Sequence, residues 1–216
     1  MSQLYGPSHR RLHDQFGTGR LANRLEDLSH AEFDDADREF ITNAPMFFLS
    51  TVDTLGRPTV SYKGGAPGFV RITGSSELLF PSYDGNGMFL SVGNIAATAN
   101  IGMLFIDFEN PRRLRLQGVA RIAEIDAQSA DYPGAQLLIS VQIERIFVNC
   151  GRYIHRTRER LSAHVPDENG LQPFPIWKRL DLMEGALSDA DQQKADAAGG
   201  IVPITCYRGE DEPPAL

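Results

Sequence analysis

The sequence is poor in cysteine and has no long hydrophobic run. Its two cysteines, Cys150 and Cys206, lie far apart, and neither belongs to a CxxC pair. This usage argues against a disulfide framework and favours a reducing, cytoplasmic compartment. No stretch reaches the roughly 18 apolar residues of a membrane helix. The N-terminal residues also lack the apolar segment of a secretory signal, so we expect no membrane association.

Positive charge is also scarce. The chain has 21 lysines and arginines against 28 aspartates and glutamates, which gives a formal net charge of −7. A general nucleic-acid or membrane-surface binder needs a basic face, so we expect neither partner. Hydrophobic residues make up 42% of the 216 residues, which is enough for a core without disulfides.

Three regions of the chain differ in pattern. Residues 1–45 form a polar N-terminal segment with helical periodicity. Residues 46–150 contain five or six short apolar segments separated by turns, with one helix near 88–96. Residues 151–216 combine a basic run, a loop and short helices, which we expect to complete the same domain. Strands at short spacing with helices at both ends predict a small barrel with peripheral helices, not a doubly wound parallel sheet.

Two polar segments beside glycines follow predicted strands: SYKGG at 61–65 and SYDGNG at 82–87. Glycine lets the backbone approach a ligand closely, and serine, tyrosine and lysine supply donors for phosphate-like oxygens. Two ordinary hairpin turns would use the same residue types. From the residues alone, a ligand site and a pair of turns both remain possible.

The segment RRLRLQG at 112–118 alternates in character. Arg113, Arg115 and Gln117 fall on one face of a predicted strand, and the leucines between them fall on the other. An outward polar face is common on a half-buried strand. Two arginines without carboxylates on their own face would also suit an anion or a carbonyl-rich ring.

Other candidate groups have simpler explanations. Asp107 and Glu109 are expected to pair with the arginines that follow them, rather than to act as general acid and base. Cys150 and His155 lack the further ligands of a metal site, so we expect no metal. Trp177 is either a core residue or the border of a planar ligand.

The order of features over residues 44–124 resembles the FMN-binding split barrels of the pyridoxamine 5′-phosphate oxidase-like family. The features are a hairpin of the form xxDxxGxP, a lysine ending the next strand, an F-x-S strand end with a glycine loop that opens a helix, and a buried strand followed by R-x-x-G. The resemblance implies a mainly β (α+β) fold with peripheral helices, built on a six-stranded antiparallel split barrel. It also implies a homodimer with FMN in the clefts between subunits.

The resemblance assigns cofactor-binding roles to four segments of the chain and to Trp177. These residues are Ser61, Tyr62 and Lys63 at the ribityl and phosphate end; Pro81, Ser82 and Tyr83 along the flavin ring; Asn86, Gly87 and Met88 at the helix start; and Arg113, Arg115, Gln117 and Trp177. His155 and Arg156 resemble the substrate-binding segment of the oxidase. The sequence departs from the family at 86–88, where the oxidase has a serine-arginine-lysine clamp. Lys63, the amide groups of the helix start and an arginine from elsewhere in the chain are therefore expected to hold the phosphate.

These implications predict an FMN-dependent oxidoreductase that transfers a hydride between FMN and a small substrate or NAD(P)H. The flavin ring carries the redox chemistry, so no catalytic side chain is assigned. The alternative is a non-catalytic FMN- or haem-binding carrier or sensor of the same fold. A deazaflavin in place of FMN and a purely structural dimer are further alternatives.

Overall fold

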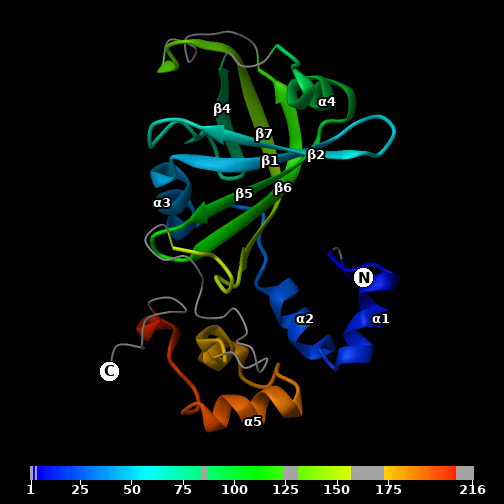
Figure 1. Ribbon diagram of the computed structural model, residues 1–216, viewed down its shortest axis with the longest axis vertical. Coiled ribbons are helices and arrows are strands. Elements are labelled where there is room, and N and C mark those ends of the chain that lie inside the picture. The colour runs from blue at the N-terminus through cyan, green and yellow to red at the C-terminus, as the bar shows by residue number, and fades with distance from the viewer. Residues whose placement is uncertain (1, 3, 84–86, 124–130, 157–172, 208–216) are drawn as a thin grey trace. The chain divides into compact units, whose positions relative to one another are not determined.

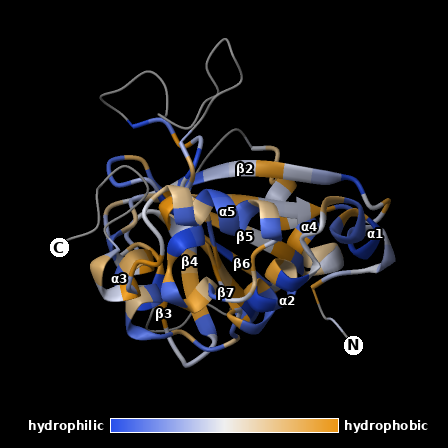
Figure 2. Cartoon of the chain, turned by 90° about the horizontal axis from the view of Figure 1, so that it is seen from below, coloured by the Kyte–Doolittle hydropathy of each residue, from blue (hydrophilic) through white to orange (hydrophobic). Residues whose placement is uncertain are grey.

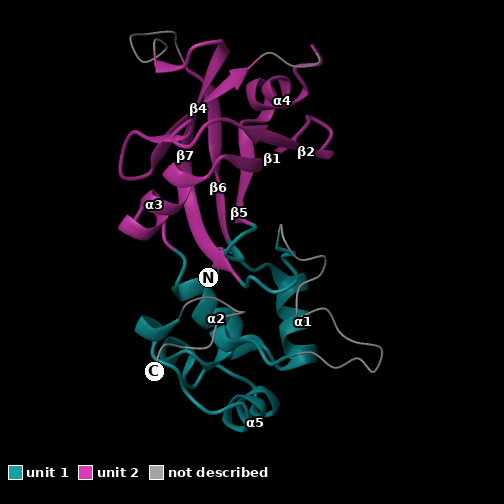
Figure 3. Ribbon diagram, turned by 60° about the vertical axis from the view of Figure 1, so that its left-hand side comes forward, with its two compact units in different colours: residues 1–29, 108–112, 150–216 teal, residues 30–107, 113–149 magenta. Residues whose placement is uncertain are grey.

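The structure is a computed structural model of the chain, and it describes residues 2, 4–83, 87–123, 131–156 and 173–207. Two compact units are distinguished in Figure 3. Unit 1 comprises residues 1–29, 108–112 and 150–216, and unit 2 comprises residues 30–107 and 113–149. The division into segments at 45 and 150 stays a prediction.

A seven-stranded sheet dominates unit 2 (Figure 1). Its strands are β1 (Met46–Val52), β2 (Pro58–Gly64), β3 (Arg71–Ile72), β4 (Glu77–Tyr83), β5 (Asn100–Asp107), β6 (Arg112–Ile122) and β7 (Ala135–Asn149). They lie in the order β2-β1-β5-β6-β7-β4-β3. Strand β1 pairs antiparallel with β2 and β5, and β7 pairs antiparallel with β4 and β6.

The hairpin between β1 and β2 sets the position of β2. Asp53 Oδ1 accepts hydrogen bonds from the backbone amides of Leu55 and Arg57, both at 2.9 Å. Gly56 has a φ of 77°, a conformation that glycine adopts without steric cost. Hydrogen bonds from Arg57 hold the pKa of Asp53 below its usual value. The turn thereby fixes the pairing of Val52 with Pro58 and the register of the residues that follow.

Aromatic side chains fill the core of unit 2. The ring of Phe47 lies 5.1 Å from the rings of Phe80 and Phe105 and 5.9 Å from that of Phe69. On β6, Leu114 and Leu116 are buried in the same core, whereas the polar residues between and beside them are more exposed. Figure 2 shows hydrophobic residues gathered on β4, β6 and β7, in contrast to a largely hydrophilic α5.

Helices accompany both units. They are α1 (Pro7–Phe16), α2 (Gly19–Asp27), α3 (Asp35–Asn43), α4 (Leu90–Thr98) and α5 (Asp189–Ala197), with short 3-10 helices η2 (Ile176–Arg179), η3 (Asp181–Met183) and η4 (Ile204–Cys206). Helix α4 packs on β1 and β2 within unit 2. Within unit 1, Leu21 of α2 and Ala195 of α5 belong to one small hydrophobic cluster. Among the described residues, no helix has the length and apolar character needed to cross a membrane.

The predicted fold class is confirmed, because the chain forms a mainly antiparallel sheet of the split-barrel class with peripheral helices. The strand number is seven rather than six. The additional strand is β3, which has only two residues and pairs with β4. The helix predicted near 88–96 is also confirmed as α4.

Candidate functional site

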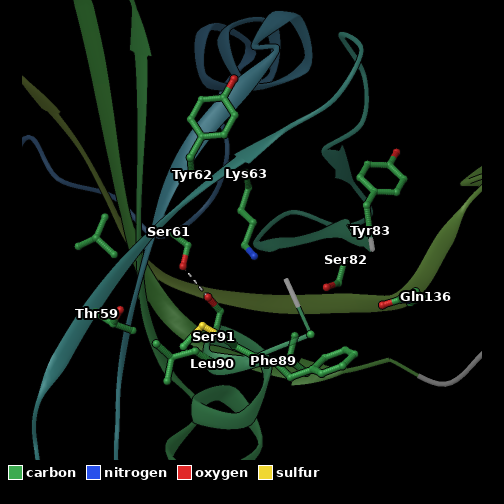
Figure 4. A pocket seen from close by; sticks show the side chains of 14 residues that line it. Thr59, Ser61, Tyr62, Lys63, Ser82, Tyr83, Phe89, Leu90, Ser91 and Gln136 are labelled. Carbon is green, nitrogen blue, oxygen red and sulfur yellow. Dashed lines mark hydrogen bonds between the residues drawn. The ribbon is translucent and has the colours of Figure 1, made fainter. Parts of the chain in front are cut away.

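A cavity of about 360 Å³ lies in unit 2 between β2, the end of β4 and the start of α4 (Figure 4). It is lined by Thr59, Val60, Ser61, Tyr62, Lys63, Ser82, Tyr83, Gly87, Met88, Phe89, Leu90, Ser91, Val92 and Gln136. Its volume falls in the range of small-molecule and cofactor sites. The two polar segments that the sequence analysis singled out therefore border one cavity.

Strand β2 borders the cavity through five consecutive residues, 59–63. Successive side chains of a strand point to opposite faces, so a consecutive run implies that the edge of the strand also borders the cavity. β2 is an edge strand of the sheet. Among the described strands it pairs only with β1. The outer backbone N–H and C=O groups of β2 can therefore bond a ligand.

Lys63 brings a cation to this cavity. Its side chain is partly buried, and burial lowers its pKa below the usual lysine value. Among the residues that the structure describes, no carboxylate forms an ion pair with it, and none contributes to this shift. A desolvated ammonium group without an anionic partner favours binding of an anion. Figure 4 shows its amine between Ser61 and Ser82.

The first turn of α4 forms the opposite wall. Among the residues that the structure describes, no side chain caps this helix start, so its backbone amides are placed to bind an anion. Ser91 of this turn shares a hydrogen bond with Ser61 of β2, with 2.7 Å between their Oγ atoms. Farther along α4, Asn94 Nδ2 donates to Thr51 Oγ1 at 3.0 Å. The first bond fixes the helix start relative to β2, and the second fixes the helix relative to β1.

Large apolar side chains surround the mouth of the cavity. Six large hydrophobic residues of the lining are exposed: Val60, Tyr62, Tyr83, Met88, Phe89 and Leu90. Single exposed apolar residues are ordinary, but a group of them around one cavity indicates a binding surface. The cavity therefore combines a partly buried lysine with several exposed apolar side chains.

The structure brings together most of the predicted residues of the two polar segments. Ser61, Tyr62, Lys63, Ser82, Tyr83, Gly87 and Met88 all line the cavity. Pro81 is buried on β4 beside Ser82 and does not line it. Asn86 lies outside the described residues.

The remaining predicted residues lie elsewhere. Arg113, Arg115 and Gln117 are on β6, and the described lining of the cavity does not include them. Trp177 packs against the small hydrophobic cluster of unit 1. His155 and Arg156 also belong to unit 1. Their assigned ligand-binding roles stay predictions.

Sequence reasoning missed several lining residues, among them Phe89, Ser91 and Gln136. Phe89 and Ser91 follow the glycine segment directly, and a wider window around it would have included them. Gln136 lies on β7, which pairs with β4 only in the folded sheet. No local signal in the sequence could have connected Gln136 to the cavity.

A separate polar cluster lies at the start of α3. Ligand atoms of His30, Asp34 and Asp37 all lie within 4.8 Å of one another. Asp34 and Asp37 form a capping box, and His30 Nε2 lies 2.6 Å from Asp37 Oδ2. Helix capping accounts for the position of the two aspartates, and the contact with Asp37 accounts for that of His30.

Comparisons with known proteins indicate a family. A family model described as pyridoxamine 5′-phosphate oxidase matches residues 33–173. No curated protein matches the chain. Similar solved structures include HupZ from Group A Streptococcus, at 19% identity over 54% of this chain and 93% of that chain, with a TM-score of 0.44.

Two other similar structures are HutZ, the heme storage protein of Vibrio cholerae, and an FMN-binding protein from Syntrophomonas wolfei. HutZ is 23% identical over 54% of this chain and 94% of its own, with a TM-score of 0.40. The FMN-binding protein is 13% identical over 65% of this chain and 94% of its own, with a TM-score of 0.39. At these TM-scores, the similarities carry no argument about function.

Proposed function

The chain belongs to the pyridoxamine 5′-phosphate oxidase family, and from this premise we propose that it is an FMN-dependent oxidoreductase with its cofactor in the cavity of unit 2. The observation that carries the proposal is the partly buried Lys63, which has no anionic partner among the described residues and lines the cavity. A phosphorylated cofactor supplies the missing negative charge.

The phosphate end fits the interior of the cavity. Lys63 provides one charge-assisted hydrogen bond, and the uncapped start of α4 provides amide donors. The buried Ser82 adds a hydroxyl from the opposite strand. These donors take the place of the serine-arginine-lysine clamp that the sequence lacks.

The ring end fits the strand edge and the apolar mouth. A flavin ring has hydrogen-bonding groups along one edge and flat apolar faces. The open edge of β2 can pair with such an edge, and Met88 and Phe89 offer apolar contact beside it. When bound, FMN supplies the capacity to accept or donate a hydride. The chain's own residues bind it, orient it and exclude water from one side.

We further propose a homodimer that completes the site. The rings of Phe48 on β1 and Tyr62 on β2 are in contact, with centroids 6.0 Å apart. Tyr62 and Val60 are more than half exposed, so an apolar sheet face continues into the cavity mouth. A second subunit would cover it. Arg113 and Arg115 would then be candidates to stabilise negative charge on the reduced ring. Sedimentation analysis of the purified protein tests this assembly, and a monomer at micromolar concentration would contradict it.

A titration with FMN followed by a turnover assay tests the proposed function. We expect about one FMN per chain, judged by flavin absorbance, and oxidation of NADH, NADPH or pyridoxamine 5′-phosphate by the loaded protein. Failure to bind FMN would overturn the proposal. Bound FMN without turnover would instead indicate a carrier or sensor. Parallel titrations with a deazaflavin and with haem distinguish the other cofactors that the sequence left open.

A further inference from the structure

Phe89 has an unusual backbone conformation for a large aromatic residue. Its φ is 47° and its ψ is 25°, in the left-handed region that is unfavourable for residues other than glycine, asparagine and aspartate. The residue connects Gly87 and Met88 to the first turn of α4. A glycine would adopt the same conformation without steric cost and is well accepted before a helix.

Packing within unit 2 does not explain the aromatic side chain. Phe89 is 52% exposed, although phenylalanine is a residue type that is often fully buried. Within the described part of the chain, its ring makes no contact with another aromatic ring or with a cation. The fold therefore carries an unfavourable backbone conformation at a residue whose side chain contributes little to the core.

The side chain does, however, line the cavity. Figure 4 shows the ring on the same side of the cavity as Ser91, with Lys63 on the β2 side. Strained backbone conformations concentrate at ligand sites, where the surrounding structure maintains them. A half-exposed aromatic ring that lines the same cavity as a lysine suits a ligand that has a flat ring at one end and an anion at the other.

We propose that Phe89 is a binding residue that stacks on the planar ring of the ligand, and that the left-handed backbone holds its side chain at the cavity. This inference rests on the proposed function. It divides the ligand between two groups: Lys63 binds the phosphate, and Phe89 contacts the ring. Each group can then be tested with a ligand that has or lacks the phosphate, namely FMN and riboflavin.

Substitutions at Phe89 separate stacking from backbone strain. Phe89→Gly relieves the strain and removes the ring, so we expect the melting temperature to rise by about 2–4 °C. We also expect its affinity for FMN and for riboflavin to fall by a similar factor, about three- to tenfold. Phe89→Leu keeps the strain and an apolar side chain, so we expect the weaker binding without the gain in melting temperature. Phe89→Trp keeps an aromatic ring, so it should bind FMN and riboflavin about as tightly as the wild-type protein does.

Two control variants complete the design. Ala99 at the other end of α4 also has a positive φ, 62°, but it does not line the cavity. Ala99→Gly should raise the melting temperature and leave both affinities unchanged. Lys63→Met should weaken FMN binding far more than riboflavin binding, because only FMN carries a phosphate.

Wild-type affinities retained by both Phe89→Gly and Phe89→Leu would overturn the stacking role and leave the proposed function intact. A fall in FMN affinity with unchanged riboflavin affinity in the Phe89 variants would also overturn it, because the effect would then concern the phosphate. Wild-type protein that binds neither flavin would overturn the proposed function itself, which the first titration shows before any variant is made.

Discussion

Ser61 and Ser91 join the two walls of the cavity, because their Oγ atoms lie 2.7 Å apart. Ser61 belongs to β2, and Ser91, which is 5% exposed, belongs to the first turn of α4. A hydroxyl can donate one hydrogen bond and accept two. The pair therefore fixes the distance between the strand edge and the helix start while an acceptor position stays available to a ligand.

Removal of one hydroxyl should loosen the site. We expect Ser91→Ala to lower the free energy of unfolding by about 1 kcal/mol and FMN affinity severalfold, as measured by chemical denaturation and by titration. Thr98→Val is the matched control, because Thr98 Oγ1 donates to the Val52 carbonyl at 2.7 Å at the opposite end of α4. It should destabilise the fold similarly without weakening FMN binding. Equal loss of affinity in both variants would contradict the positioning role.

Lys63→Met should change stability and binding in opposite directions. Without ligand, the variant should be more stable, because it removes an ammonium group that burial has desolvated. FMN affinity should fall about tenfold or more, since a charge-assisted hydrogen bond is lost. Thermal melts with and without FMN measure both effects. The exposed Lys194 provides the control variant Lys194→Met, in which neither quantity should change. A less stable ligand-free Lys63→Met protein would contradict the desolvation argument.

Because of Lys63, we expect both the stability of the ligand-free protein and its affinity for FMN to depend on pH. Its pKa is lowered in the folded protein, so over the interval between the folded and unfolded pKa values the unfolded chain binds more protons. Stability of the ligand-free protein should therefore rise with pH across this interval. FMN affinity should fall as pH rises through the folded pKa of Lys63, because the neutral amine no longer attracts the phosphate. Titrations across this range should show the fall in wild-type protein and not in Lys63→Met.

Local signals in the sequence drew attention to one part of the site without deciding its role. Glycines at the ends of their strands singled out Ser61–Lys63 and Ser82–Tyr83, the family resemblance assigned these residues to a cofactor, and both segments line the cavity. The alternation of Arg113 and Arg115 with buried leucines was also predictable, because a strand has a period of two.

Other parts of the site depend on tertiary structure. Gln136 reaches the cavity only through the pairing of β7 with β4, which joins residues from 52 (Tyr83 with Ala135) to 65 (Glu77 with Gln142) positions apart. The left-handed φ of Phe89 contradicts the preference of an aromatic residue, so propensity would have predicted the opposite. Strand pairing over long sequence distances and backbone strain at a ligand site cannot be predicted from a short segment of sequence.

Gly118 on β6 provides a test of how tightly the sheet that carries the site is packed. It lies at an irregularity in the pairing of β6 with β7, and a Cβ at this position would collide with the carbonyl oxygen of Gln142. Because that oxygen belongs to the backbone of β7, Gly118→Ala should force the two strands apart. We expect a loss of about 1–3 kcal/mol in the free energy of unfolding, measured by denaturant titration.

Gly102 on β5 is the matched control for this substitution. A Cβ there would meet the Ser50 side chain at 3.8 Å and the Leu116 carbonyl oxygen at 3.9 Å, which are ordinary contacts. Alanine also loses less conformational freedom than glycine in a strand, so Gly102→Ala should be neutral or should stabilise the fold by about 0.5 kcal/mol. Because β7 also pairs with β4, which carries Ser82, Gly118→Ala should weaken FMN binding as well, and Gly102→Ala should not. Equal free energies of unfolding for the two variants would show that β6 and β7 can accommodate a Cβ at position 118 without loss of stability.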